Sequence, residues 1–147
     1  MKKKITLLCT TILLSISLVA CSKGEETDLN QALGSKEITV TPTQITREKT
    51  ASNRKNILKV EVKVKNNTAK SVGIGAGNFT LKDDNDRNYE IYGMKEDSLG
   101  QEVEANQTIN GNIYFEIPKE LEKGWLSYTF QIDQEPSAEW LLAFPSK

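Results

Sequence analysis

The sequence predicts an all-β domain, an antiparallel β-sandwich of about seven or eight short strands, behind an N-terminal leader. Three observations favour this fold class. Apolar and polar residues alternate in most segments after residue 37, turn-forming residues separate these segments, and no helical period follows the leader. The roughly 110 residues of this region are enough for one ordinary domain and too few for two.

The leader has the composition of an export signal. Residues 2–4 are lysines, and residues 5–19 carry no charge. This apolar run is shorter than the ~20 residues that a bilayer-spanning helix needs, and a small residue follows it, as in cleaved signals. We therefore expect a signal peptide over residues 1–20. A plain signal peptide without lipid attachment and an uncleaved anchor are the alternatives.

The end of the leader resembles the lipobox of bacterial lipoproteins. Leu18, Val19 and Ala20 directly precede Cys21. Ala20 is small enough to let a protease approach the scissile bond, and Leu18 supplies an apolar contact. The resemblance implies that the thiol of Cys21 carries a diacylglyceryl group and becomes the new N-terminus. We expect a bacterial protein that is lipid-anchored on the extracytoplasmic face of the cell membrane, with Cys9 lost in the leader.

A polar stretch separates the lipobox from the domain. Residues 22–36 hold several acidic side chains and only three apolar ones. Such a stretch buries too little surface to offset its ordering entropy. We expect a lipid-anchored, disordered tether over residues 21–36, spanning roughly 20 Å, and a folded domain over residues 37–147.

The first two strands of the domain have different patterns. Ile38 and Val40 alternate with threonines until Pro42, which cannot donate to a ladder and is confined to edges or bulges. Because Ile45 then has the opposite parity, we expect a broken edge strand in which Pro42 marks a bulge or a switch between sheets. Residues 57–65 alternate strictly between apolar and charged side chains, which predicts a half-buried strand with one wet face.

Polar residues 83–86 follow the apolar positions of residues 79–81 and predict a hairpin turn. Residues 93–106 lack a period and are expected to form a surface loop anchored by Leu99 and Val103. Alternation returns in three further segments, which predict the remaining strands: 109–117, 126–132 and 140–144.

Four of these stretches together are typical of one family. They are LKVEVKVKNNT (58–68), NFTLKDDNDRNYE (78–90), GNIYFEIP (111–118) and LSYTF (126–130). They resemble uncharacterised bacterial domains with a telokin-like immunoglobulin fold, related to a secreted immunoprotective antigen. The resemblance implies an immunoglobulin-like sandwich and carries no catalytic residues. The chain departs from the pattern at Asp86-Arg87, where a glycine is common.

Two segments have the composition of ligand sites. The acidic residues 83–86 suggest calcium, because hard cations take oxygen ligands. Tyr89 and Lys95 stand where an EF-hand loop needs Gly and Glu, so a solvated turn is favoured and a looser cation site is the alternative. The alternate glycines within 73–77 precede a strand, whereas phosphate cradles precede a helix N-terminus; a bulge or irregular crossing is favoured there.

Two surface features could bind a partner. Trp125 and Tyr114 have the opposite parity from the apolar rows beside them, which predicts an exposed contact patch, because aromatic residues anchor interfaces. Five lysines could form a basic stripe for anionic polymers or lipid headgroups, although Glu61 interrupts it and a solvated face is favoured. These lysines are Lys55, Lys59, Lys63, Lys65 and Lys70.

The composition argues against catalysis. The chain has no histidine, and lipidation would block the one cysteine left after cleavage. Removing the three lysines of the leader leaves 16 basic and 20 acidic residues, a net charge of −4, which gives no reason to expect nucleic-acid binding. We expect no cofactor, no metal and no enzyme activity, but a binding module for a protein or cell-envelope polymer. A structural subunit of an envelope complex and, less favoured, a carboxylate-based hydrolase are the alternatives.

Overall fold

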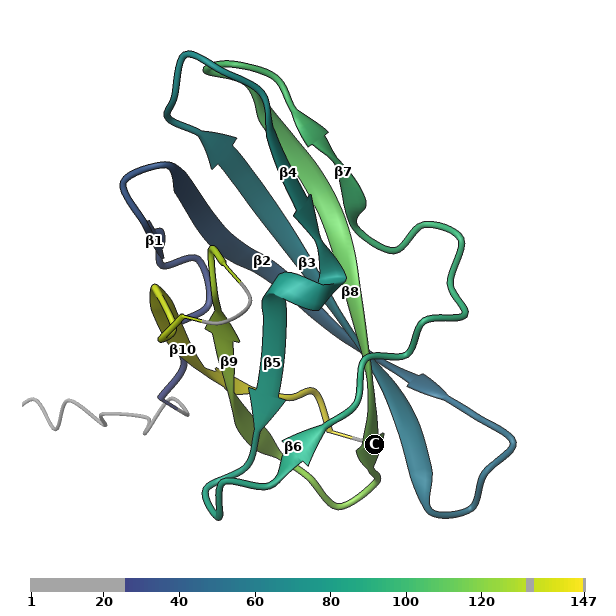
Figure 1. Cartoon of the computed structure of the whole chain (residues 1–147). Helices are drawn as coiled ribbons and strands as arrows, with labels where there is room; N and C mark the ends of the chain where they lie inside the picture. Colours follow the sequence, from purple (N-terminus) through teal and green to yellow (C-terminus); the bar gives the residue numbers. More distant parts are fainter. Residues whose placement is uncertain (1–25, 132–133, 147) are drawn as a thin grey trace, which may run out of the picture.

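The computed structural model describes residues 26–131 and 134–146 (Figure 1). The described residues form ten strands and one 3-10 helix, η1, and contain no helix long and apolar enough to cross a bilayer. The elements are β1 (Leu33–Gly34), β2 (Ile38–Lys49), β3 (Lys55–Asn66), β4 (Val72–Gly75), η1 (Ala76–Asn78), β5 (Phe79–Lys82), β6 (Asn88–Tyr89), β7 (Gly100–Val103), β8 (Thr108–Pro118), β9 (Lys123–Tyr128) and β10 (Ala138–Ala143).

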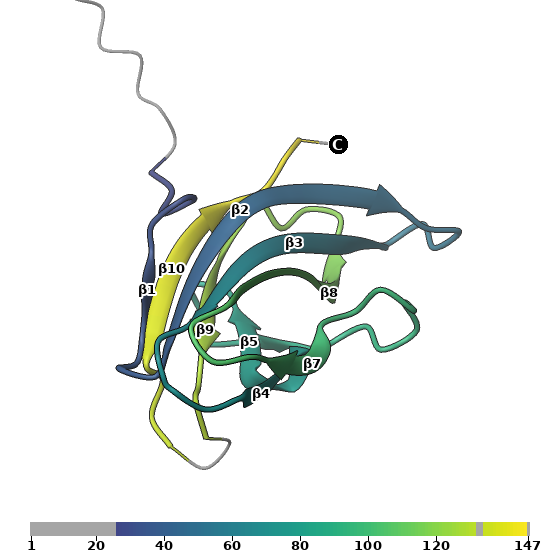
Figure 2. The same cartoon turned by 90° about the horizontal axis from the view of Figure 1, so that it is seen from above.

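Two four-stranded sheets form the sandwich (Figures 1 and 2). The first has the order β1-β2-β3-β8 and the second the order β10-β9-β5-β6. A separate two-stranded sheet pairs β4 with β7. All strand pairs are antiparallel, so the predicted all-β antiparallel sandwich is confirmed.

The predicted bulge in the first strand is also confirmed. The register between β2 and β3 passes from Pro42 opposite Val62 to Gln44 opposite Glu61, which leaves one β2 residue extra. The extra residue turns Ile45 back toward the core, as its parity predicts. Since β1 pairs with β2 only at Thr39 and Val40, Pro42 lies on an edge stretch.

The core lies between the sheets and is rich in aromatic residues. Trp140, Tyr128, Phe79 and Phe115 are fully buried, and the rings of Phe79 and Tyr128 lie 5.3 Å apart. The alternating residues of β3 supply Leu58, Val60, Val62 and Val64, all inaccessible to solvent. Burying one such large apolar side chain contributes about 1.5–3 kcal/mol, so this face holds the two sheets together.

The chain before β1 is part of the fold. The backbone N–H of Asp28 donates to the carbonyl oxygen of Leu141 on β10 (2.7 Å), and that of Asn30 donates to Pro42 on β2 (2.7 Å). This N-terminal segment, residues 26–34, therefore crosses from the edge of the second sheet to the edge of the first.

Side chains hold the N-terminal segment as well. The indole Nε1 of Trp140 donates to the carbonyl oxygen of Gln31 (2.8 Å), and Leu29 and Leu33 pack against the core. We expected a tether up to residue 36, and for residues 26–36 that expectation is wrong. The stretch is polar in composition, but its few apolar residues and its backbone groups find partners on two strand edges.

The region expected to be a loop, residues 93–106, contains β7. Leu99 and Val103 are buried, as predicted, but residues 100–103 also pair with β4. A strand of four residues is too short to show a period. Gly111 on β8 makes room for this segment, because a Cβ atom there would lie 2.5 Å from the Cδ1 of Leu99.

The opposite edge of the sandwich is covered by residues 88–92, which pass from the second sheet to the first. The backbone N–H of Tyr92 donates to Tyr114 (2.8 Å), and that of Glu116 donates to Glu90 (3.1 Å). Ile91 also bridges to Phe115. The chain thus uses its own backbone groups to satisfy the outer edge of β8.

Candidate functional site

The lipobox lies outside the described residues. Leu18, Val19, Ala20 and Cys21 therefore remain a sequence-based prediction, as does lipid attachment at Cys21. The described part begins at Glu26, five residues after that cysteine.

The predicted aromatic contact patch is wrong. Tyr114 is only 2% exposed on β8 of the first sheet, whereas Trp125 is 38% exposed on β9 of the second. The outward parity of Tyr114 is correct, but the loop at residues 92–98 folds over it. The two side chains therefore form no common surface.

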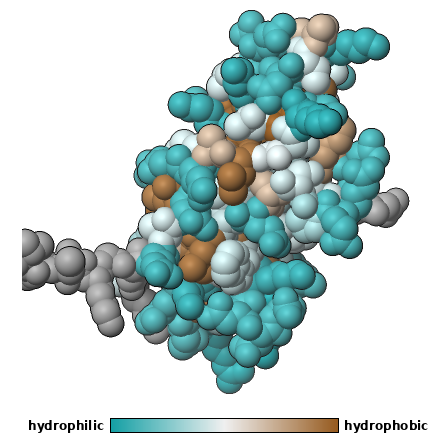
Figure 3. Space-filling view, turned by 90° about the vertical axis from the view of Figure 1, so that its left-hand side faces the viewer, coloured by the Kyte–Doolittle hydropathy of each residue, from teal (hydrophilic) through white to brown (hydrophobic). Residues whose placement is uncertain are grey.

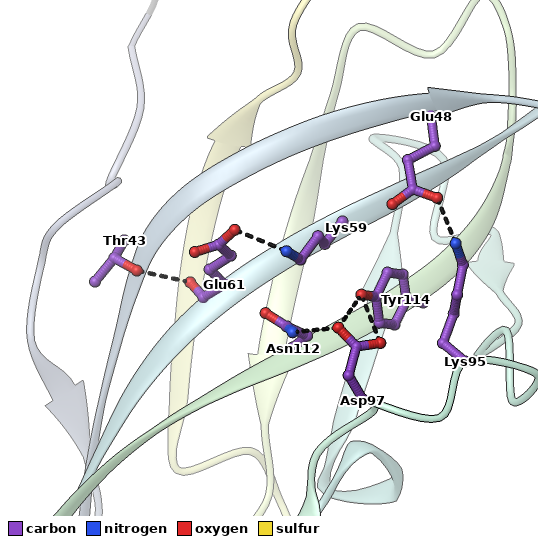
Figure 4. Close-up of polar contacts among 8 residues, drawn as sticks. All are labelled: Thr43, Glu48, Lys59, Glu61, Lys95, Asp97, Asn112 and Tyr114. Carbon is purple, nitrogen blue, oxygen red and sulfur yellow. Dashed lines mark hydrogen bonds and ion pairs between the residues drawn. The ribbon is translucent and has the colours of Figure 1, made fainter.

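A carboxylate in this loop holds Tyr114 in place (Figure 4). The Tyr114 hydroxyl donates to both carboxylate oxygens of Asp97 (3.0 and 2.9 Å), and the Asn112 Nδ2 donates to one of them (2.7 Å). The hydrogen bond from Tyr114 lowers the pKa of Asp97, and burial together with the nearby carboxylate raises the pKa of Tyr114. The carboxylate is therefore ionised and engaged.

Lys95 fixes the other end of the loop. Its Nζ lies 2.6 Å from a carboxylate oxygen of Glu48 on β2 and 5.3 Å from the ring centroid of Tyr114 (Figure 4). The loop thus extends over β8 and β3 and reaches β2. We call Glu48, Lys95, Asp97, Asn112 and Tyr114 the loop clamp. The residues of the loop clamp form hydrogen bonds and an ion pair with one another, so the clamp holds the loop onto the sheet.

Ion pairs divide the row of lysines that was considered as a basic stripe. Lys55 pairs with Glu116, and Lys59 pairs with Glu61 at 2.9 Å (Figure 4). The other three lysines of the row are exposed, but they lie at the far end of β3 and beyond it: Lys63, Lys65 and Lys70. The row therefore offers a short charged end and no continuous stripe.

In the acidic turn at residues 83–86, the first carboxylate is engaged by hydrogen bonds from nearby residues of the chain. Asp83 accepts hydrogen bonds from the backbone N–H groups of Arg87 and Asn85 and from the Tyr89 hydroxyl, and these bonds lower its pKa. Asp86 takes the left-handed conformation (φ 59°) at the place where a glycine is common. In the part of the chain that the structure describes, no three Asp, Glu, Cys or His residues are placed to share a metal ion.

A hollow of about 510 Å³ lies beside this turn. Leu121, Leu141 and Ala143 form its apolar floor. Its polar rim comes from the N-terminal segment, the β5–β6 turn and the β8–β9 turn: Glu26, Asp83, Asp84, Asn85, Glu120, Glu122 and Lys123. Lys123 pairs with Asp84 (3.0 Å), so the rim keeps a carboxylate excess. We call this site the acidic hollow.

The sequence contains the residues that line the acidic hollow, but it does not show that these residues lie close together in space. Its residues come from four separate segments, and one of them was expected to be a tether. Figure 3 shows a mainly hydrophilic surface at the lower end of the molecule, where the β5–β6 and β8–β9 turns lie in Figure 1. This end of the sandwich therefore carries the polar loops.

Solved structures of low sequence identity share the fold. A candidate lipoprotein from Bacillus subtilis (ycdA) is 18% identical with a TM-score of 0.60; the match covers 78% of this chain but only 38% of that one. The secreted protein MPT63 from Mycobacterium tuberculosis is 13% identical with a TM-score of 0.58, over 77% of this chain and 93% of that one. An uncharacterised β-sandwich protein from Clostridium difficile 630 is 11% identical with a TM-score of 0.53, over 80% and 91%.

These structures support the expected sandwich fold. Comparison with curated proteins gives no match. The match to a protein family covers nearly all of the domain, including the N-terminal segment that packs on β10 and β2. Residues 26–139 match the domain of unknown function DUF4352, and the chain belongs to that family.

Proposed function

We propose that the chain is an exported lipoprotein, anchored through Cys21, whose sandwich is a non-catalytic binding module for a protein or a cell-envelope polymer. The observation that carries the proposal is the acidic hollow, an open depression with an apolar floor at the loop end of a sandwich. Loops on a rigid scaffold commonly serve recognition. An apolar floor with a few charged groups at its rim is the usual composition of a binding site.

The negative charge of the rim indicates which kind of partner would bind there. Asp83, Asp84 and Glu122 line the hollow together with Leu121, and Lys123 pairs with Asp84. A cationic segment with an apolar side chain, such as a lysine-rich peptide or an amine-bearing polymer, complements this surface. Such pairs gain association rate and specificity from charge complementarity, and they weaken as salt is added.

The lipid anchor would hold the hollow close to the membrane. Glu26 on the rim lies five positions after Cys21, and a fully extended chain over that distance spans at most about 18 Å. With the N-terminal segment packed on the sandwich, the module has less freedom than the expected tether would give it. Its partner is therefore sought at or near the membrane surface.

Site-specific crosslinking in intact cells tests the proposal. A photoreactive amino acid replaces Leu121 at the floor of the hollow, and in a control chain it replaces Lys63, which is exposed on the other sheet. We expect an envelope component to be captured at position 121 and not at position 63, and mass spectrometry identifies it. Glu122→Lys should lower the capture, whereas Glu102→Lys, the same charge change on exposed β7, should not.

Three outcomes decide between the alternatives. Equal capture at both positions would remove the hollow as the binding site. A stoichiometric complex that survives extraction from membranes would favour a structural subunit over a transient binder. Hydrolysis of envelope material by the purified protein, lost on substitution of one carboxylate, would replace the binding proposal with an enzyme.

A further inference from the structure

A second cavity, of about 290 Å³, lies between the turn end of the β2–β3 hairpin and the C-terminal residues. The β8–β9 turn separates it from the acidic hollow. Its lining is basic where that of the hollow is acidic: Arg47, Lys49, Thr50, Asn56, Lys119 and Ser146. We call it the basic cavity.

The strand register explains why polar residues gather there. Arg47 and Lys49 of β2 pair with Leu58 and Asn56 of β3 and share the face that forms the core further along. At the hairpin end, this inward face thus changes from apolar to polar. A binary pattern that favoured only packing would place apolar residues at these positions.

Arg47 builds the wall of the basic cavity. Its guanidinium donates to the carbonyl oxygens of Pro145 (2.9 Å), Lys119 (3.0 Å) and Leu121 (2.5 Å), and so fastens the C-terminus and the β8–β9 turn to β2. Burial lowers the pKa of Arg47 and the carboxylates of Glu122 and Glu120 oppose this, but the group remains a cation at neutral pH. The cavity therefore has a fixed, positively charged wall.

Asn56 is the unexplained group at this site. It is 3% exposed and lines the cavity, yet no described residue donates a hydrogen bond to its Oδ1. Buried side-chain oxygens nearly always have a donor. The Oδ1 is itself buried, so it reaches an occupant of the cavity when the amide rotates and exchanges the places of Oδ1 and Nδ2.

Two ammonium groups at the rim also lack partners. Among residues 26–131 and 134–146, neither Lys49 nor Lys119 forms an ion pair. The charges of Lys49 and Lys119 favour an anion, and the unpaired oxygen of Asn56 can accept from a hydroxyl or amine donor. An anion that also carries a hydroxyl group meets both conditions.

We propose that the basic cavity binds a polyol phosphate, with Lys49 and Lys119 meeting the phosphate and Asn56 accepting from a hydroxyl group. The same chemistry is presented by a soluble glycerol phosphate and by the headgroup of phosphatidylglycerol. The site is independent of the acidic hollow, since it carries the opposite charge and shares no lining residue with it.

Titration calorimetry on the full-length protein in detergent tests the site with sn-glycerol 3-phosphate, inorganic phosphate and glycerol. Glycerol phosphate should bind one to one, about tenfold more tightly than phosphate, the effect of one good hydrogen bond to a buried acceptor. Lys49→Gln and Lys119→Gln should each weaken it about tenfold, whereas Lys63→Gln should not. Flotation with phosphatidylglycerol vesicles, against phosphatidylcholine vesicles, tells whether the ligand is also taken from a membrane.

A substitution at Asn56 separates binding from structure. Asn56→Leu keeps the branched shape and removes the unpaired oxygen, so it should raise the melting temperature while it abolishes the preference for glycerol phosphate over phosphate. The proposal is overturned if neither glycerol phosphate nor phosphatidylglycerol vesicles bind, if the two lysine variants bind as the wild type does, or if phosphate binds as tightly as glycerol phosphate.

Discussion

The indole of Trp140 donates a hydrogen bond to the carbonyl oxygen of Gln31, at 2.8 Å. The contact joins the last strand to a segment more than a hundred residues earlier in the chain. Trp140 is inaccessible to solvent, so its indole N–H would be left without a partner if the bond were broken. The N-terminal segment is thereby part of the cooperative unit.

Trp140→Phe should therefore destabilise the protein. The change removes the hydrogen bond to the Gln31 carbonyl and opens a small cavity, and we expect a loss of about 1–3 kcal/mol. Urea unfolding at equilibrium measures it. Trp125→Phe is the matched control, since that side chain is 38% exposed and should change the free energy of unfolding by less than about 0.5 kcal/mol.

Gly34→Ala should also disrupt the N-terminal segment. Gly34 has φ 156°, and a Cβ atom there would lie 2.0 Å from the carbonyl oxygen of Ile38. Backbone strain and the clash together should cost more than about 2 kcal/mol. Gly77→Ala, where an added Cβ meets open space, should have little effect. Equal stability of the two variants would mean that β1 does not pair as described.

Tyr114→Phe tests the loop clamp. It removes the hydroxyl that donates to Asp97 and should cost about 1.5–3 kcal/mol, as expected for a hydrogen bond to a charged group. Hydrogen exchange should become faster in residues 92–98 and stay unchanged in β5. A uniform change across the sandwich would contradict a local fastening.

At acidic pH, the free energy of unfolding depends on the ionisation of Asp97 and Asp83. Both have a folded-state pKa below the ordinary 3.8. The unfolded chain binds these protons first, so the stabilisation is complete above pH 3.8 and is lost as the pH falls through the lower folded values. Unfolding free energies measured from neutral pH downward should decline less steeply in Asp97→Asn than in the wild type.

Lipid attachment is tested at Cys21. Cys21→Ala should abolish incorporation of a labelled fatty acid, because the thiol is the expected acceptor. Cys9→Ala should leave the labelling unchanged, because residue 9 lies in the leader. Labelling that persists in Cys21→Ala would refute the lipoprotein assignment.

Strand alternation predicted the sandwich well. The pattern around Val60 and the break at Pro42 are local features, and each is reproduced by the pairing of β2 with β3. Leu99 and Val103 were recognised as anchors, but their strand, β7, was missed. Its four residues show no period, and its stability comes from pairing with β4.

The misses at Tyr114 and at residues 26–36 share a physical cause. Parity tells which face of a sheet a side chain occupies, but not whether a distant loop covers that face. Tyr114 is buried by Asp97 and Lys95, which sequence alone does not place over it. The acidic hollow and the basic cavity were missed for the same reason, since each gathers residues from separate segments.

The covered strand edges limit how a partner can dock. On β10, Leu141 exchanges hydrogen bonds with Asp28, and on β8, Tyr114 and Glu116 bond to residues 90–92. A peptide that extends a sheet by adding a strand needs a free row of such groups, and neither edge offers one. At these two edges, a partner can then be contacted only through side chains. The turns that join the strands can vary in sequence without altering this hydrogen-bonded framework.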